Sequence, residues 1–156
     1  IGVSFKEQKE NPLYFVELMA SHVGWSNYQE IKIEFDQEKP SQKQVLDQGW
    51  EDVTNYSLGG NYRFYQSGDS VMKIRGGIGW VQSPIPEKNL GPMLPDLNGR
   101  QAYSAGWSWN DRKMRLDLAY LLSDFKNSKV TKNNQLKGNY EVQVEAIGAS
   151  IGYYWE

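Results

Sequence analysis

The sequence has no cysteine and only one histidine, His22, among its 156 residues. Without cysteine the chain forms no disulfides and offers no thiolate ligands, and a single histidine excludes a metal site built on several histidines. Its 17 basic and 19 acidic side chains nearly balance. Such a chain lacks the basic stripe that binds a phosphate backbone, so we expect no nucleic-acid partner.

Long hydrophobic runs are also missing. No uncharged apolar stretch approaches the roughly 18 to 20 residues that a membrane-spanning helix needs, and residues 1–10 lack the basic start and apolar stretch of a signal peptide. A helical membrane protein is therefore excluded. A membrane β-barrel is not, because each of its strands crosses with about ten alternating residues that hydropathy averages conceal.

The sequence does contain repeated alternation of apolar and polar residues with a period of two, which is typical of β-strands. In residues 101–110, for example, aromatic residues and alanine alternate with serine and glycine. The same pattern predicts seven strands in all. They are residues 1–8, 11–35, 53–65, 71–80, 101–110, 113–123 and a final run that ends at residue 155.

Two of the predicted strands contain a change of phase. Within residues 11–35, the change predicts a bulge or kink over residues 24–29. In the last strand, Val142 and Val144 have the opposite parity to the apolar residues that follow. This predicts either a bulge near residues 145–146 or a strand whose upper part leaves the membrane.

The connections between these strands alternate strictly between short and long. The short ones are residues 6–11, 66–70 and 110–113, and the long ones are residues 36–52, 82–100 and 124–139. In an antiparallel meander every second connection lies at the same end, so one end carries tight turns and the other long loops. Outer-membrane barrels have this asymmetry, with short periplasmic turns and long extracellular loops.

A soluble antiparallel barrel would show the same alternation, with its apolar face turned inward. The loop asymmetry and the polar faces rich in glycine, serine and charge favour the membrane barrel. Aromatic residues near strand ends also fit the interface girdles of such barrels; these are Trp80, Trp109, Tyr153 and Trp155. We therefore expect an all-β, transmembrane, antiparallel up-and-down β-barrel and keep a soluble or periplasmic lipid-binding β-barrel as the alternative.

Six segments carry a family resemblance, and its most specific parts are a Ser-Pro-x-Pro after one strand and a Pro-Asp-x-x-x-Arg before the next. The segments are GWSNYQEIKI (24–33), GWEDVTNYSLGGNYRF (49–64), MKIRGGIGWVQSPIP (72–86), LPDLNGRQAYSAGWSW (94–109), MRLDLAYLL (114–122) and LKGNYEVQVEAIGASIGYYW (136–155). In this order they resemble the C-terminal half of the FadL-type outer-membrane transporters for long-chain fatty acids and other hydrophobic compounds.

The resemblance implies an outer-membrane protein of a Gram-negative bacterium that moves such compounds passively. Ligands would be captured at extracellular loops and would leave by lateral diffusion through the barrel wall, with no reaction and no cofactor. The family barrel has fourteen strands and an N-terminal hatch. Residues 1–156 are therefore expected to be the C-terminal portion of such a barrel, without the hatch and the first strands.

A seven-stranded sheet cannot stand alone in hydrocarbon, because each unpaired backbone group on its two edges costs several kcal/mol. The partner strands are expected from the same longer chain, or alternatively from another chain that completes a half-barrel. A third alternative is a closed eight-stranded barrel, in which residues 13–35 divide into two strands at Gly24.

An apolar ligand with a carboxylate needs an apolar surface for its tail and one or two cations for its head. Candidate cations on the predicted inward faces are Arg63, Lys73, Arg75 and Arg115. The alternative is that they only pair with Asp117, Glu51 or Asp52 in a wet lumen. The family resemblance places a ligand-binding lysine in the loop of residues 36–52, where Lys43 is the nearest match and Lys39 is also available.

The long connection of residues 82–100 holds four of the six prolines of the chain. Each proline fixes its own φ angle and lacks a backbone N–H donor. With Pro84, Pro86, Pro92 and Pro95, we therefore expect this connection to form a rigid cover at the barrel mouth. We expect a charged contact between Asp96 and Arg100 to hold its end. Apolar loop residues are candidate contacts for the ligand; they are Val45, Leu46, Leu90, Met93 and Leu94.

Catalysis finds little support in the sequence. No recognisable nucleophile motif accompanies His22 that would make it a catalytic base. Glu141 and Glu145 follow a loop and are interpreted as solvated charges and not as a catalytic carboxylate pair. The glycines of residues 76–80 lack the spacing of a phosphate-binding loop. We expect no enzyme, and the other remaining alternative is a structural outer-membrane barrel that transports nothing.

Overall fold

The computed structural model describes residues 1–8, 12–35, 42–47, 49–87, 99–131 and 137–155, with only the backbone described for residues 31, 33–35, 42–47 and 126–128. Within these ranges the chain forms nine strands and one short 3-10 helix, η1 (Trp25–Asn27). The strands are β1 (Gly2–Lys6), β2 (Tyr14–Val23), β3 (Glu30–Phe35), β4 (Gln42–Asp47), β5 (Val53–Ser67), β6 (Ser70–Val81), β7 (Arg100–Asn110), β8 (Met114–Val130) and β9 (Gly138–Tyr153).

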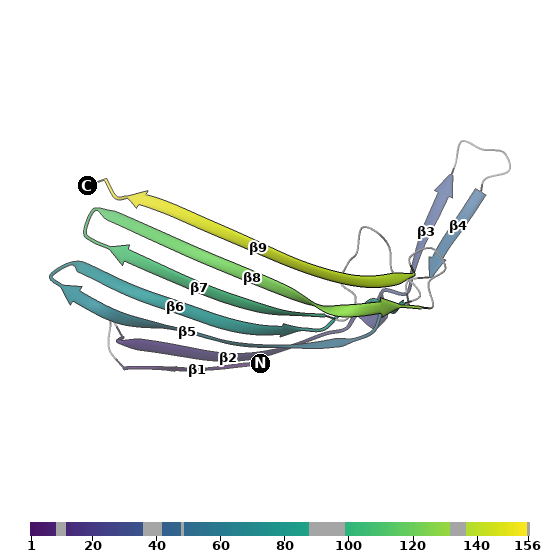
Figure 1. The fold of residues 1–156 in the computed structure, drawn as a ribbon, viewed down its shortest axis with the longest axis horizontal. Helices are drawn as coiled ribbons and strands as arrows, with labels where there is room; N and C mark the ends of the chain where they lie inside the picture. Colours follow the sequence, from purple (N-terminus) through teal and green to yellow (C-terminus); the bar gives the residue numbers. More distant parts are fainter. Residues whose placement is uncertain (9–11, 36–41, 48, 88–98, 132–136, 156) are drawn as a thin grey trace.

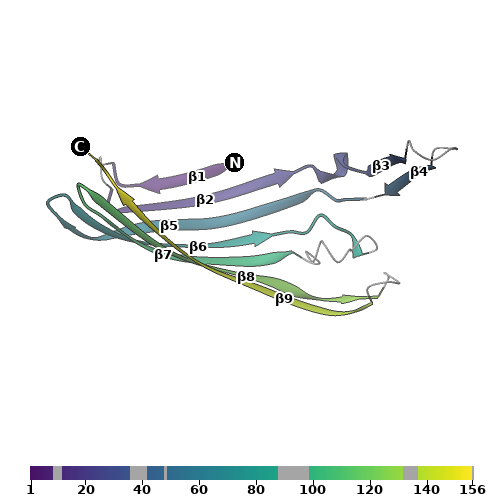
Figure 2. The ribbon, with the colours of Figure 1, turned by 90° about the horizontal axis from the view of Figure 1, so that it is seen from above.

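Seven of the strands form one antiparallel sheet in the order β1-β2-β5-β6-β7-β8-β9. The sheet is long, curved and twisted, and the tight turns lie at one end while the long connections lie at the other (Figures 1 and 2). The predicted up-and-down antiparallel arrangement and the asymmetry of its ends are thereby confirmed. The sheet is not closed, since β1 and β9 are its two edges.

The prediction of one long strand over residues 11–35 was wrong. Strand β2 ends at Val23, η1 follows, and β3 leaves the main sheet to pair with β4 as a separate hairpin at the long-loop end (Figure 1). The connection of residues 36–52 therefore contains a strand of its own. The closed eight-stranded barrel is also wrong, because residues 25–35 add no strand to the main sheet.

Strands β8 and β9 reach further than predicted, which shortens the connection of residues 124–139. Their pairing runs from Met114 opposite Tyr153 to Val130 opposite Gly138, with one register shift between Phe125 and Ser128. The predicted bulge near residues 145–146 is absent, because this part of β9 pairs without interruption. The change of parity instead marks the part of β9 nearest the long-loop end, where the outward-facing residues of the strand are polar.

The two faces of the main sheet differ sharply. Large apolar side chains on one face remain exposed, including Leu118 at 51%, Ile147 at 84% and Ile151 at 75%. Among the described hydrophobic residues only Val53, Ile85 and Val130 are buried, so this sheet has almost no core of its own. A wide apolar surface of this kind is stable only against another apolar medium, and its alternation with a polar face matches a strand between lipid and lumen.

The apolar face has the height of a membrane. On β8 its residues run from Met114 to Leu122, eight residues further along the strand. At about 3.3 Å per residue and a tilt of about 40° this distance projects to roughly 20 Å, close to the roughly 25 Å band of outer-membrane barrels. On the paired strand, Glu145 lies opposite Leu122, which places the upper boundary near this level.

Aromatic residues mark the end of the band at the tight turns. The Trp109 indole Nε1 donates a hydrogen bond of 2.8 Å to the Ser70 hydroxyl in the neighbouring strand. The Tyr153 and Trp155 rings pack edge to face with their centroids 4.8 Å apart. Such rings, apolar with a polar atom at the rim, are most stable where hydrocarbon meets water.

A small apolar cluster lies at the long-loop end. Ile85 and Val130 are buried there and pack against Trp50 and Tyr140. The backbone N–H of Glu51 donates a 2.9 Å hydrogen bond to the Pro84 carbonyl. The described start of the proline-rich connection is therefore fixed to the segment before β5 and to the long-loop ends of β8 and β9. In the described part of the chain, no helix is long and apolar enough to cross a membrane.

Candidate functional site

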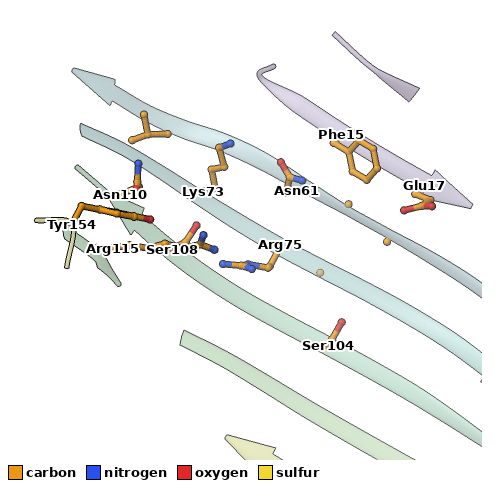
Figure 3. A pocket seen from close by; sticks show the side chains of 14 residues that line it. Phe15, Glu17, Asn61, Lys73, Arg75, Ser104, Ser108, Asn110, Arg115 and Tyr154 are labelled. Carbon is orange, nitrogen blue, oxygen red and sulfur yellow. The ribbon is translucent and has the colours of Figure 1, made fainter. Parts of the chain in front are cut away.

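The polar face of the sheet contains a hollow of about 640 Å³ near the tight-turn end (Figure 3). Strands β2, β5, β6, β7 and β8 contribute its wall. Because successive side chains of a strand point to opposite faces, the residues between the lipid-facing ones are collected here. Its lining includes the charged residues Glu17, Lys73, Arg75 and Arg115 with the neutral polar residues Asn61, Ser104, Ser108 and Asn110.

Two arginines of this face share one carboxylate. Arg115 donates to Asp117 through Nε at 2.6 Å and Nη2 at 3.3 Å, and Arg75 donates from Nη2 to the Asp117 Oδ1 atom. The Asp117 side chain is only 17% exposed, whereas the two arginine side chains remain 43% and 51% exposed. The guanidinium groups therefore face the hollow while their shared partner lies beneath them.

Glycine at position 106 makes this contact between β6 and β8 possible. Arg75 pairs with Gly106 of β7, and Asp117 lies on the far side of that strand. A β-carbon at Gly106 would lie 2.8 Å from Arg75 Cγ and 3.1 Å from its Cδ. The absence of a side chain thus allows the arginine to cross β7 and reach the carboxylate.

Lys73 adds a third cation to the hollow. It lies two residues before Arg75 on the same face of β6 and is half-buried. Within the described residues, no hydrogen bond or ion pair of its ammonium group is found. With Asp117 and Glu17 as the two carboxylates, the three cations leave one net positive charge. In Figure 3, Arg75 and Arg115 extend toward each other beside Ser108.

Two shallower hollows of about 290 and 310 Å³ continue the surface toward the long-loop end. Both are lined by Ser104, which also lines the first hollow, the basic hollow of Lys73, Arg75 and Arg115. Small residues dominate their walls, and the larger side chains that point to the polar face of the sheet are Glu17, Met19, Arg75 and Leu121. The small residues are Ser57, Gly59, Gly76, Gly77, Gly79, Ala102, Ala105, Ala119, Ala146 and Gly148.

An aromatic cluster at the mouth was not anticipated from the sequence. The Trp25 and Trp50 ring centroids are 5.0 Å apart, and those of Tyr28 and Trp50 are 5.3 Å apart. Among the residues that the structure describes, the buried Trp50 Nε1 atom has no hydrogen-bond partner. The β3–β4 hairpin separates Trp50 in sequence from Trp25 and Tyr28, so only the fold brings Trp50 against them.

Asp52 holds η1, which carries Trp25, against the start of β5. The backbone N–H of Ser26 donates to Asp52 Oδ1 at 2.8 Å. This bond, with a further one from the Ser26 side chain and the nearby His22, holds the pKa of Asp52 below its ordinary value. His22 Nε2 lies 4.0 Å from Asp52 Oδ2, and its Nδ1 lies 3.1 Å from the Thr54 hydroxyl.

The structure brings together only some of the predicted site residues. Lys73, Arg75 and Arg115 meet in the basic hollow, and Arg75 and Arg115 pair with Asp117, as the alternative to a ligand-binding role predicted. Arg63 is on the same wall but outside the hollow, and it donates to the Gln66 side-chain oxygen.

The predicted loop residues lie elsewhere. Lys43, Val45 and Leu46 belong to β4, of which only the backbone is described, at the end of the molecule opposite to the basic hollow. Pro84 and Pro86 flank buried Ile85, and the Arg100 guanidinium lies over the Phe125 ring, 5.4 Å from its centroid. The other predicted positions lie outside the described residues; they are Lys39, Leu90, Pro92, Met93, Leu94, Pro95 and Asp96.

Metal chemistry has no visible site in the ranges described, where no group of three or more histidine or acidic side chains is arranged to hold an ion.

Comparisons with known proteins agree with this architecture. The family model described as "Outer membrane protein transport protein (OMPP1/FadL/TodX)" matches residues 3–155. The fold is similar to the crystal structure of a Pseudomonas aeruginosa FadL homologue, with a TM-score of 0.65 and 17% identity over 96% of this chain. The chain spans 32% of the length of that homologue. No curated protein matches the sequence.

Proposed function

The chain belongs to the outer membrane protein transport family (OMPP1/FadL/TodX), and from this premise we propose that it takes part in the passive uptake of long-chain fatty acids or other hydrophobic compounds. The protein resides in the outer membrane of a Gram-negative bacterium, as its family does. The observation that carries the proposal is the division of the sheet into a lipid-facing apolar face and a lumenal wall with continuous hollows.

The lumenal wall supports a path for an apolar molecule. Its upper part is formed by glycine, alanine and serine with single larger apolar residues such as Met19 and Leu121. An acyl chain can lie against such a wall without displacing side chains, and its burial is favourable at about 25 cal/mol per Å². We propose capture at the aromatic mouth around Trp50, passage along this wall, and release sideways through the barrel wall into the membrane.

We further propose that residues 1–156 form the C-terminal portion of a larger barrel. The two edge strands β1 and β9 expose unpaired backbone groups, which lipid cannot satisfy. Additional strands must cover them. We assign these strands to the same longer chain. A mass measurement on the purified barrel distinguishes this assignment from the alternative, in which a second chain completes a half-barrel.

Uptake of radiolabelled oleate tests the proposed function. Cells that lack the gene are expected to accumulate less label than cells complemented with the full-length gene, because outer-membrane lipids alone admit the fatty acid slowly. Equal accumulation would contradict transport and would support a structural barrel. A band that shifts on an unheated gel, with extraction that requires detergent, is expected of a membrane barrel; a chain soluble without detergent would support a lipid-binding soluble barrel instead.

A further inference from the structure

The contact between β5 and β6 has no side chains at the middle of its length. Gly59 of β5 lies directly opposite Gly77 of β6, and Gly60 lies opposite Gly76. Successive residues of a strand point to opposite faces. At this level, therefore, neither the lipid-facing nor the lumenal face of the contact has a cross-strand pair of side chains. We call these four residues the glycine seam.

We propose that the glycine seam is a hinge in the barrel wall. Two stiffer panels, β1-β2-β5 and β6-β7-β8-β9, change their angle about it and so change the width of the lumen as a molecule passes. The link to passage rests on the proposed function, whereas the hinge itself does not. The hinge adds a moving part to a wall that is otherwise a regular sheet.

Two further features weaken the same contact on the side of the tight turn. Arg63 of β5 lies directly opposite Lys73 of β6, and like charges in directly opposite positions destabilise a strand pair. The register then shifts between Arg63 and Tyr65, which marks a bulge that interrupts the ladder of hydrogen bonds. Within the described residues, no hydrogen bond or ion pair joins a side chain of β5 to a side chain of β6.

The panel of β6 to β9, in contrast, is held together on its lumenal face. Arg75 of β6 crosses β7 to reach Asp117 of β8, and Arg115 of β8 binds the same carboxylate. Arg115 also forms a hydrogen bond with the Tyr154 side chain, just beyond the end of β9. In Figure 3, Arg75 extends toward Arg115 and away from β5. These contacts connect β6 to the strands that follow it, and none of them connects it to β5.

The contact between β5 and β6 is fastened at its two ends. A tight turn joins the strands where Ser67 pairs with Ser70. At the long-loop end, the Thr54 N–H donates to the Gln82 side chain at 2.8 Å, and the Gln82 N–H donates to the Asn55 side chain at 3.0 Å. The panels can therefore bend about the seam without separating, so that no backbone group has to lose its partner to lipid.

The seam lies beside the lumenal hollows. Gly59 and Gly76 line both the basic hollow and the adjacent hollow of about 290 Å³. A change of angle between the panels thus changes the width of the lumen at the level of both hollows. Because glycine has the widest range of backbone angles of any residue, the wall bends most easily at this level.

Hydrogen exchange in β6 tests the hinge without any ligand. In an antiparallel sheet, successive N–H groups of a strand donate alternately to the neighbours on its two sides, so β6 provides its own control. In the full-length protein in detergent micelles, the amides of residues 74–79 that donate to β5 are expected to exchange about tenfold faster than those that donate to β7. Local opening is easier where few side chains hold the strands together. Equal exchange on the two sides would overturn the hinge.

A disulfide across the seam tests whether the motion is needed for uptake. Gly59→Cys with Gly77→Cys places two thiols in directly opposite positions, at a Cα separation that a disulfide spans. An added β-carbon would meet its nearest atom at 3.6 Å for Gly59 and at 3.1 Å for Gly77, the latter being the mobile Ser104 hydroxyl. With this disulfide formed, uptake of radiolabelled oleate is expected to fall toward the level of cells without the gene, and dithiothreitol is expected to restore it.

Ala119→Cys with Gly148→Cys is the matched control. The two residues lie directly opposite each other on β8 and β9, on the same lumenal face but inside one panel. Their disulfide adds the same bulk without crossing the seam, so uptake is expected to be the same before and after reduction. Unheated gel mobility shows that each barrel has formed, and mass measurement shows that each disulfide has.

The other outcomes contradict the hinge in distinguishable ways. Full uptake with the seam disulfide formed would show that no motion at the seam is needed. Equal loss in the control would show that the motion is not located there, and a loss that dithiothreitol does not reverse would show that the glycines only provide space. If wild-type cells take up no more oleate than cells without the gene, the proposed function fails, and the exchange measurement alone decides whether the hinge exists.

Discussion

The replacement Leu118→Arg tests whether the apolar face is in contact with lipid. Leu118 is 51% exposed on β8 and is the middle one of five outward residues from Met114 to Leu122. In a lipid bilayer the substitution moves a guanidinium into hydrocarbon, whereas on a surface in water it would change little.

The magnitude follows from the depth of the residue. Leu118 is four residues from each end of the apolar run of β8, or about 13 Å along the strand, and a tilt of about 40° reduces this to about 10 Å along the membrane normal. Leu118 is therefore near the midplane, where arginine costs about 2 to 4 kcal/mol in a barrel. Leu122→Arg, near the boundary, is expected to cost about 0 to 1 kcal/mol.

Equilibrium unfolding in denaturant, with the barrel refolded into phosphatidylcholine vesicles and monitored by tryptophan fluorescence, measures these costs. Gly148→Arg is the matched control, because Gly148 is on the lumenal face of neighbouring β9 and an added β-carbon there meets no atom within 4 Å. We expect its free energy of unfolding to change little. Equal losses for Leu118→Arg and Gly148→Arg, or a larger loss for Gly148→Arg, would refute the assignment of the faces.

Three further predictions follow from the loop end. Gly99→Ala is expected to destabilise the barrel by about 1 to 3 kcal/mol, because Gly99 has a φ of +76° and a β-carbon would overlap the Val81 carbonyl oxygen; Gly148→Ala, in open space, is expected to show no such loss in the same unfolding assay. Because the hydrogen bond from Ser26 lowers the pKa of Asp52, the contact is present at neutral pH and is lost only as the pH falls through this lowered pKa. The Ser26 amide signal in micelles should therefore shift with an apparent pKa below 3.8, and a midpoint at or above that value, or a shift that persists in Asp52→Asn, would contradict the contact. Arg100→Ala is expected to speed hydrogen exchange in residues 82–100, because it removes the contact of Arg100 with Phe125. Asp96→Ala is expected to do the same through loss of the proposed tie between Asp96 and Arg100. Unchanged exchange in both variants, compared with a Gln101→Ala control, would show that no such tie exists.

The strands of the main sheet could be predicted because each separates two media. Lipid on one side and water on the other impose a strict period of two, as in residues 103–109 and 114–122. The β3–β4 hairpin was missed because residues 30–35 alternate as well, and alternation does not indicate which strand is the partner. The sequence left open whether Val142 and Val144 marked a bulge or a strand that leaves the membrane. The answer depended on the register in which β9 pairs with β8, and a register cannot be read from one strand alone.

The basic hollow could be predicted only in part. Arg75, Arg115 and Asp117 were each placed on inward faces by parity, but their contact depends on the register that brings Gly106 between β6 and β8. The sequence signal that could have indicated this contact is a glycine at an inward position of the intervening strand, opposite an arginine on the neighbouring strand. The aromatic cluster of Trp25, Tyr28 and Trp50 left no local signal, because a folded-back hairpin brings it together.

The most direct test of the central claim blocks the lumen at the wall described above. Ser104→Trp and Gly148→Trp place bulky side chains on the small-residue surface while leaving the lipid-facing residues intact. If hydrophobic molecules pass along this wall, uptake of radiolabelled oleate by cells with the double variant falls toward the level of cells without the gene, although the barrel still shifts on an unheated gel. Full uptake by a folded, blocked barrel would contradict the account.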